Sequence, residues 1–240
     1  MIPIYFIGIS IYIWGIGTVK EQISSSKAAQ INAYIDNFEK EIQRIKTQQS
    51  DCLLGDDLNR LANSHEYMND YEKGYFMLKL QQRLNAVNNS SIYVKNAVAI
   101  IPSIKKRVPG VGSISGLREE DYEMLMINDN STPSQIAYVN NRLYLNAIFP
   151  SNYILESRMP LYSIIVELSS DEIRKALSQF NYNNGSGTIL LSSERDFDLA
   201  SGENTDSIKF IKNYAREQLQ KSGESNTPVR IDDRNYQCMR

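Results

Sequence analysis

Two polar side chains with binding chemistry, Tyr144 and Asn146, alternate along the stretch 142–149. Every second side chain of a β-strand points to the same face, so a phenol and an amide would share that face. Together they could hold a small polar ligand by stacking and hydrogen bonds. Arg107 and Arg142 could neutralise an anionic ligand. The alternative for all four is ordinary solvated surface, because polar faces of antiparallel sheets and exposed arginines are common.

Catalytic and metal-binding residues are sparse. The chain has one histidine, His65, and two cysteines, Cys52 and Cys238, far apart in sequence. These cannot supply the four ligands of a structural metal site, and no nucleophile–base pair, paired-acid site or phosphate-binding glycine loop is visible. We therefore expect no catalytic residue, no metal and no cofactor. The net charge of -2 argues against a nucleic-acid partner. Whether the two cysteines are free or paired stays open.

The candidate ligand residues belong to a predicted β-hairpin, residues 135–139 and 142–149, joined by Asn140 and Asn141. Asparagine tolerates the positive φ that a type I′ turn requires. Pairing across this turn predicts an apolar face and a more polar one. The apolar face contains Ile136, Tyr138, Leu143, Leu145, Ala147 and Phe149, and the other contains Ala137, Tyr144, Asn146 and Ile148.

Other elements follow from local patterns. We expect strands at 92–94, 97–101 and 161–168, and a short helix at 119–127. Ser169 and Glu172 form the pattern of a capping box that opens a helix carrying Ile173, Leu177 and Phe180. A further helix is predicted from about residue 66 to 87, with one face marked by Tyr71, Tyr75 and Leu78 and continued by Leu80, Leu84 and Val87.

A long N-terminal helix must position all of these elements. Residues 1–19 contain no charged side chain, and at ~1.5 Å per residue they would span ~28 Å, enough for the hydrocarbon core of a bilayer. A cleaved signal peptide is the alternative, but the apolar run is longer than usual and no A-x-A site follows it. The helix continues to about residue 48 or 52 with an apolar seam that has the 3–4 spacing of a partner-facing stripe: Ala28, Ile31, Ile35, Phe38, Ile42 and Ile45.

The predicted organisation has four parts. Residues 1–19 form a transmembrane helix, 20–52 a long signalling helix, and 53–182 a membrane-distal α+β module. Residues 183–240 begin a second, membrane-proximal module, which we expect to be incomplete because its sheet lacks closing strands.

The order of these parts resembles the extracytoplasmic half of Gram-positive sensor histidine kinases that carry a double Cache sensor. The stretches that carry the resemblance are SIYVKNAVAIIP, IAYVNNRLYLNAIFP and PLYSIIVELSSDEIRKAL. The outer half of membrane-anchored AraC-type regulators is very similar. The resemblance implies PAS-like antiparallel-sheet modules mounted on one long helix.

By this resemblance, the chain would be a ligand-sensing region outside the cell membrane. It would pass a conformational signal through the membrane helix to a cytoplasmic kinase that this chain does not contain. The implied partners are an unknown small molecule or protein and a second copy in the membrane. The aromatic/Arg cluster of amino-acid-binding relatives is only partly present at Arg142 and Tyr144, so no ligand is assigned. A non-signalling, membrane-tethered binding module is the remaining alternative.

Overall fold

The computed structural model describes residues 2–126, 134–150, 160–181, 188–191, 198–201, 228–231 and 234–237. Within these ranges the side chains of residues 2–14, 20, 24, 28, 134–135, 189, 191, 198, 228–231 and 234–237 lie outside the description. The chain divides into two compact units. One comprises Met1–Lys40 with Thr205–Arg240, and the other comprises Glu41–Asn204.

Helix α1 (Ile2–Leu53) confirms the predicted long helix, including its end just before Gly55. Between Thr18 and Ser50 it contains neither proline nor glycine, so nothing in that stretch interrupts its hydrogen-bond ladder. Among the described residues, no helix combines the length and apolarity needed to cross a bilayer. The predicted membrane segment rests chiefly on residues 1–14, whose side chains are outside the described part.

The larger unit is built on one six-stranded antiparallel sheet in the order β3-β2-β1-β6-β5-β4. Its strands, in chain order, are β1 (Val94–Ile101), β2 (Lys106–Pro109), β3 (Ser115–Gly116), β4 (Ser134–Val139), β5 (Arg142–Phe149) and β6 (Tyr162–Leu168). The predicted α+β class is confirmed at this level. The predicted hairpin is also confirmed, because Asn140 and Asn141 adopt φ values of 50° and 63° and join β4 to β5.

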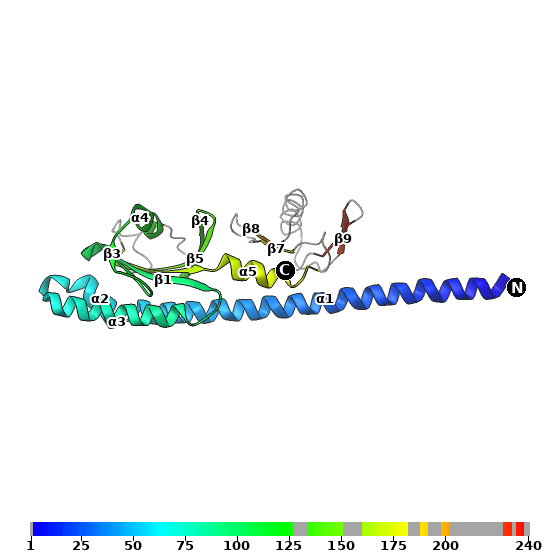
Figure 1. Cartoon of the computed structure of the whole chain (residues 1–240), viewed down its shortest axis with the longest axis horizontal. Helices are drawn as coiled ribbons and strands as arrows, with labels where there is room; N and C mark the ends of the chain where they lie inside the picture. The colour runs from blue at the N-terminus through cyan, green and yellow to red at the C-terminus, as the bar shows by residue number, and fades with distance from the viewer. Residues whose placement is uncertain are drawn as a thin grey trace. The chain divides into compact units, whose positions relative to one another are not determined.

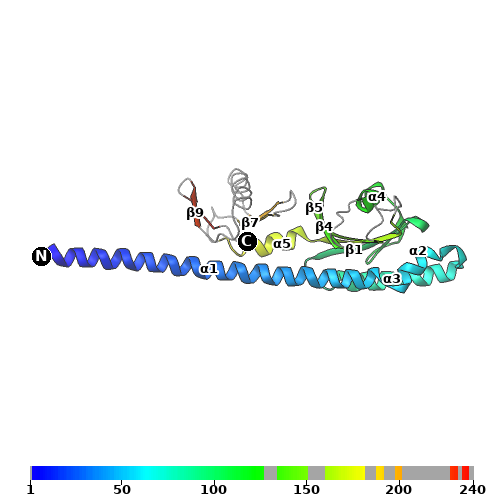
Figure 2. The ribbon, with the colours of Figure 1, turned by 180° about the vertical axis from the view of Figure 1, so that it is seen from behind.

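Helices cover both faces of this sheet, as Figures 1 and 2 show for the larger unit. One face, which we call the helical face, packs against the C-terminal part of α1 and against α3 (Asp70–Asn88); α2 (Asp56–Asn63) packs on α3. The opposite face, which we call the α4 face, is covered by α4 (Glu119–Met126). The register assigns buried residues of β1, β5 and β6 to the helical face: Ala97, Ala99, Leu145, Ile164 and Val166.

Helix α3 differs from its prediction in two respects. It begins at Asp70 rather than near Glu66, because the Asn69 side chain and Glu72 form a reciprocal capping box there. A 3-10 turn (His65–Tyr67) precedes it. Its buried residues are Leu80, Leu84 and Val87, whereas Tyr71, Tyr75 and Leu78 are exposed, so assigning those three to the same face was wrong. Both sides of the helix are apolar in sequence, and periodicity alone could not separate them.

The remaining elements follow the sheet. Helix α5 (Ser170–Ser178) begins as predicted, with the Ser169 hydroxyl accepting a hydrogen bond from the Glu172 N–H, and buries Ile173 and Leu177. It packs against a hairpin of β7 (Thr188–Leu191) and β8 (Asp198–Ser201). In the smaller unit, β9 (Pro228–Ile231) pairs with β10 (Arg234–Gln237). The predicted helix at 205–221 lies outside the described residues.

Candidate functional site

The α4 face of the sheet contains the predicted ligand residue Asn146, which is buried beneath α4 rather than solvated. Its amide Nδ2 donates to the Met124 carbonyl at 2.7 Å, and the Ser163 hydroxyl donates to its Oδ1 at 3.2 Å. Ser163 is also fully buried. Asn146 thus fastens α4 to the neighbouring strands β5 and β6.

Apolar side chains surround this polar contact. Ile100 of β1 and Ile165 of β6 pack with Met124 and Leu125 of α4 into a buried cluster. Leu117, Val139 and Tyr144 border it as partly buried side chains. Dry packing strengthens the enclosed hydrogen bonds, because the local dielectric is lower than in water. Movement of α4 relative to the sheet would therefore disturb polar and apolar contacts together.

Arg107, the second predicted ligand residue, is held by α4 through a buried ion pair. Its guanidinium lies 2.5 Å from Oδ1 of Asp121, and the Arg118 backbone N–H donates to the other carboxylate oxygen at 2.8 Å. Asp121 is buried. The charge of Arg107 is therefore already balanced, and an anionic ligand would have to compete with this carboxylate.

Arg142 and Tyr144 come together next to Glu167 of β6. The Arg142 guanidinium lies 3.9 Å from the Glu167 carboxylate, and Lys95 approaches the same carboxylate at 3.0 Å. Burial and the neighbouring charge of Glu167 raise the pKa of the Tyr144 phenol, and its hydrogen bond with Arg142 partly offsets this increase. Tyr144 is therefore un-ionised at neutral pH, and its hydroxyl can donate to a ligand. Of the predicted ligand residues, Arg142 and Tyr144 are neighbours, whereas Asn146 and Arg107 bind different residues of α4.

The helical face holds a buried polar anchor that was not predicted, Gln49 of α1. Its Nε2 donates to the Leu145 carbonyl of β5 at 2.9 Å and to the Ile164 carbonyl of β6 at 2.7 Å. Gln49 is fully buried and lies four residues after Ile45, so it continues the apolar seam of α1. Within the seam, Ile42 and Ile45 are buried, whereas Ile31, Ile35 and Phe38 are only half-buried. The sequence feature that could have identified Gln49 is its place as a polar residue at the next position of this apolar seam.

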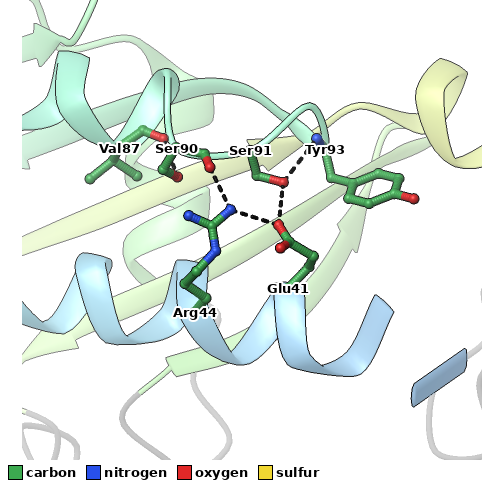
Figure 3. A network of polar contacts seen from close by, with 6 residues as sticks. All are labelled: Glu41, Arg44, Val87, Ser90, Ser91 and Tyr93. Carbon is green, nitrogen blue, oxygen red and sulfur yellow. Dashed lines mark hydrogen bonds and ion pairs between the residues drawn. The ribbon is translucent and has the colours of Figure 1, made fainter. Parts of the chain in front are cut away.

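A second polar contact fastens α1 to the loop between α3 and β1 (Figure 3). Arg44 donates to the Ser90 carbonyl at 2.5 Å and pairs with Glu41 at 2.7 Å, while the Ser91 hydroxyl donates to Glu41 at 2.9 Å. The hydrogen bond from Arg44 lowers the pKa of Glu41, although partial burial opposes the shift. The network fixes α1 at the point where it enters the larger unit.

Other reactive side chains form no second site in the part of the chain that is described. Cys52 is a buried free thiol whose pKa is raised by burial, and Cys238 lies outside the described residues. No group of three or more His, Cys, Asp or Glu residues suited to a metal ion occurs among the described residues.

Comparison with known proteins adds no assignment. A scan against protein-family models gives no match, and a search of curated proteins also gives none. Functional inference therefore depends on the site geometry and on the sequence resemblance.

Proposed function

We propose that this chain is the ligand-sensing region of a membrane-anchored signalling protein of the double Cache sensor histidine kinase type. In this proposal residues 1–19 span the membrane and the sheet unit lies outside the cell. Helix α1 transmits a conformational change to a cytoplasmic kinase elsewhere in the same protein. An antiparallel sheet with long helices on one face and a short helix on the other is the arrangement expected of a PAS-like sensor module.

The observation that carries the proposal is that β5 and β6 are bound on both faces at consecutive residues. On the helical face, Gln49 of α1 binds the carbonyls of Leu145 and Ile164. On the α4 face, the Ser163 hydroxyl of β6, one residue before Ile164, donates to Asn146 of β5, one residue after Leu145, and Asn146 donates to the Met124 carbonyl of α4. A displacement of α4 therefore acts on the same strand segments that hold α1.

This connection suggests a mechanism. A small molecule or partner protein that contacts Tyr144 and Arg142 at the edge of the α4 face would shift α4 against the sheet. Packed elements move between discrete arrangements rather than deforming continuously. A difference of a few kcal/mol in ligand affinity between two arrangements is enough to exchange their populations. Because α1 is continuous from the sheet towards residue 2, a tilt or slide at Gln49 would reach the membrane segment. We further propose that the sensor acts as a homodimer.

Ligand binding can be tested by thermal-shift screening of the region from residue 27 onward against sugars, amino acids and organic acids. A ligand of the proposed site should raise the melting temperature of the wild type. The response should weaken by at least tenfold in apparent affinity in Tyr144→Phe or Arg142→Gln. Tyr67→Phe, at an exposed tyrosine in the 3-10 turn before α3, is the matched control. Equal responses from all four proteins would exclude this edge of the sheet as the ligand site.

Signal transmission can be tested separately in the intact signalling protein. Inserting two residues after Ser26 rotates the preceding part of α1 by ~200° relative to the sheet, at ~100° per residue. The insertion should leave ligand binding unchanged and abolish ligand-dependent kinase output. Normal output from the insertion variant would contradict transmission through a rigid α1.

A further inference from the structure

Helix α3 has a second, outward-facing row of residues, which we call the outer stripe: Tyr71, Tyr75, Leu78, Gln82 and Asn85. At 100° per residue these positions lie on the side opposite Leu80, Leu84 and Val87, which pack into the core. The exposed fractions are 82% for Tyr71, 53% for Tyr75 and 54% for Leu78. Exposed aromatic and aliphatic side chains clustered on one helix face mark an interaction site more often than scattered ones do.

The spacing of the outer stripe is that of a two-stranded coiled coil. Its members follow one another at intervals of four, three, four and three residues, as the a and d positions of heptads do. No member is charged. Gly74, beside the stripe, is exposed, and a Cβ built on it would meet no atom within 4 Å, so another helix could approach closely there.

We propose that the outer stripe of α3 binds the same stripe of a second copy of this chain in parallel orientation. In a parallel pair, Tyr71, Tyr75 and Leu78 each meet their own counterpart, and Lys79 lies opposite Gly74 of the second copy. Two copies inserted into one membrane in the same orientation would bring their α3 helices together in parallel. A buried Gln82 pair would fix the register, as single polar a-position residues do.

The contact is small and suits a tethered assembly. With ~200 Å² for each large side chain, the exposed parts of Tyr71, Tyr75 and Leu78 amount to roughly 400 Å² per copy. A standard interface buries about 800 Å² per partner, so this stripe alone forms a weak dimer in solution. Two copies anchored in one membrane have a high effective concentration, which makes such a contact productive. The inference therefore rests on the proposed membrane-anchored sensor, and the parallel orientation agrees with it.

Disulfide cross-linking of single-cysteine variants tests the contact directly. The full chain, with Cys52→Ala and Cys238→Ser, is reconstituted into phosphatidylcholine vesicles and oxidised with copper phenanthroline. Leu78→Cys and Tyr75→Cys should both form dimers at least tenfold faster than Val111→Cys, a control at an exposed apolar residue of the β2–β3 loop. All three sites are exposed, so unchanged melting temperatures are expected.

The outcomes separate this inference from the proposed function. Equal rates at Leu78→Cys and Val111→Cys would overturn the α3 contact, and rapid cross-linking of Leu78→Cys alone would overturn its parallel orientation. Ile35→Cys, in the seam of α1, reports a homodimer formed elsewhere: if it cross-links while the α3 variants do not, the homodimer stands and the α3 contact fails. If the chain does not insert into the vesicles, the proposed membrane anchor is contradicted. The cross-linking rates of Leu78→Cys, Tyr75→Cys and Val111→Cys are then compared in concentrated protein without lipid, where the same differences are expected if the α3 contact forms.

Discussion

Replacing Gln49 with methionine tests how firmly α1 is bound to the sheet. Methionine keeps the length and flexibility of glutamine but cannot donate, so it removes both hydrogen bonds to the Leu145 and Ile164 carbonyls. Each buried hydrogen bond contributes ~1 kcal/mol to stability. Since Gln49 is fully buried, water cannot replace the lost donor. We expect Gln49→Met to lower the free energy of unfolding by ~1–3 kcal/mol.

Urea denaturation followed by far-UV circular dichroism measures this change. Gln43→Met is the matched control, because Gln43 lies on the same helix with its side chain exposed, and its substitution should change stability by less than ~0.5 kcal/mol. A loss at Gln49→Met no larger than that of the control would refute the buried anchor. A loss as large as expected, with an unchanged m-value, would show that the fold persists without it.

Three further substitutions test neighbouring contacts. Gly110→Ala should lower the free energy of unfolding by ~1–3 kcal/mol, because the added Cβ would lie 2.7 Å from the Leu84 carbonyl carbon of α3. The control is Gly116→Ala, whose Cβ meets nothing within 4 Å. Equal melting temperatures of the two variants would contradict the close approach of Gly110 to α3. Asp121→Asn removes the negative charge that pairs with Arg107, so it should lower the free energy of unfolding measured in urea by ~3–5 kcal/mol. A decrease below ~1 kcal/mol would mean that the ion pair contributes little to stability. Glu41→Gln tests pH dependence: the folded pKa of Glu41 is depressed, so its stabilisation is present above the unfolded pKa and is lost as pH falls through the folded value. The melting-temperature difference between wild type and Glu41→Gln should therefore be small but positive at pH 7 and shrink as the pH falls below the unfolded pKa, and a difference that grows on acidification would contradict this sign.

Elements specified by adjacent residues were predictable from the sequence. The Asn140–Asn141 turn, the Ser169 cap of α5 and the proline that follows β1 all act within a few residues of the structure they determine. Local chemistry was sufficient for each of them, so hairpin, helix start and strand end agree with the structure.

Contacts between distant segments could not be predicted in the same way. Gln49 binds carbonyls 96 and 115 positions further along the chain, and nothing near it in sequence identifies those partners. Asn146 alternates with apolar residues as a solvated strand residue would, and only the placement of α4 buries it. The inner face of α3 was assigned wrongly because Tyr71, Tyr75 and Leu78 on the opposite side are also apolar.

The measurement that tests the central claim most directly is the coupling free energy between Gln49 and Asn146. Unfolding free energies of the wild type, Gln49→Met, Asn146→Ala and the double variant form a thermodynamic cycle, with trimethylamine N-oxide present to keep the double variant folded. If the α4 face and α1 are connected through β5 and β6, the double variant should depart from additivity by ~1 kcal/mol. Additivity to within ~0.3 kcal/mol would show that the two faces of the sheet are energetically independent. That result would contradict the proposed route from the ligand face to the long helix.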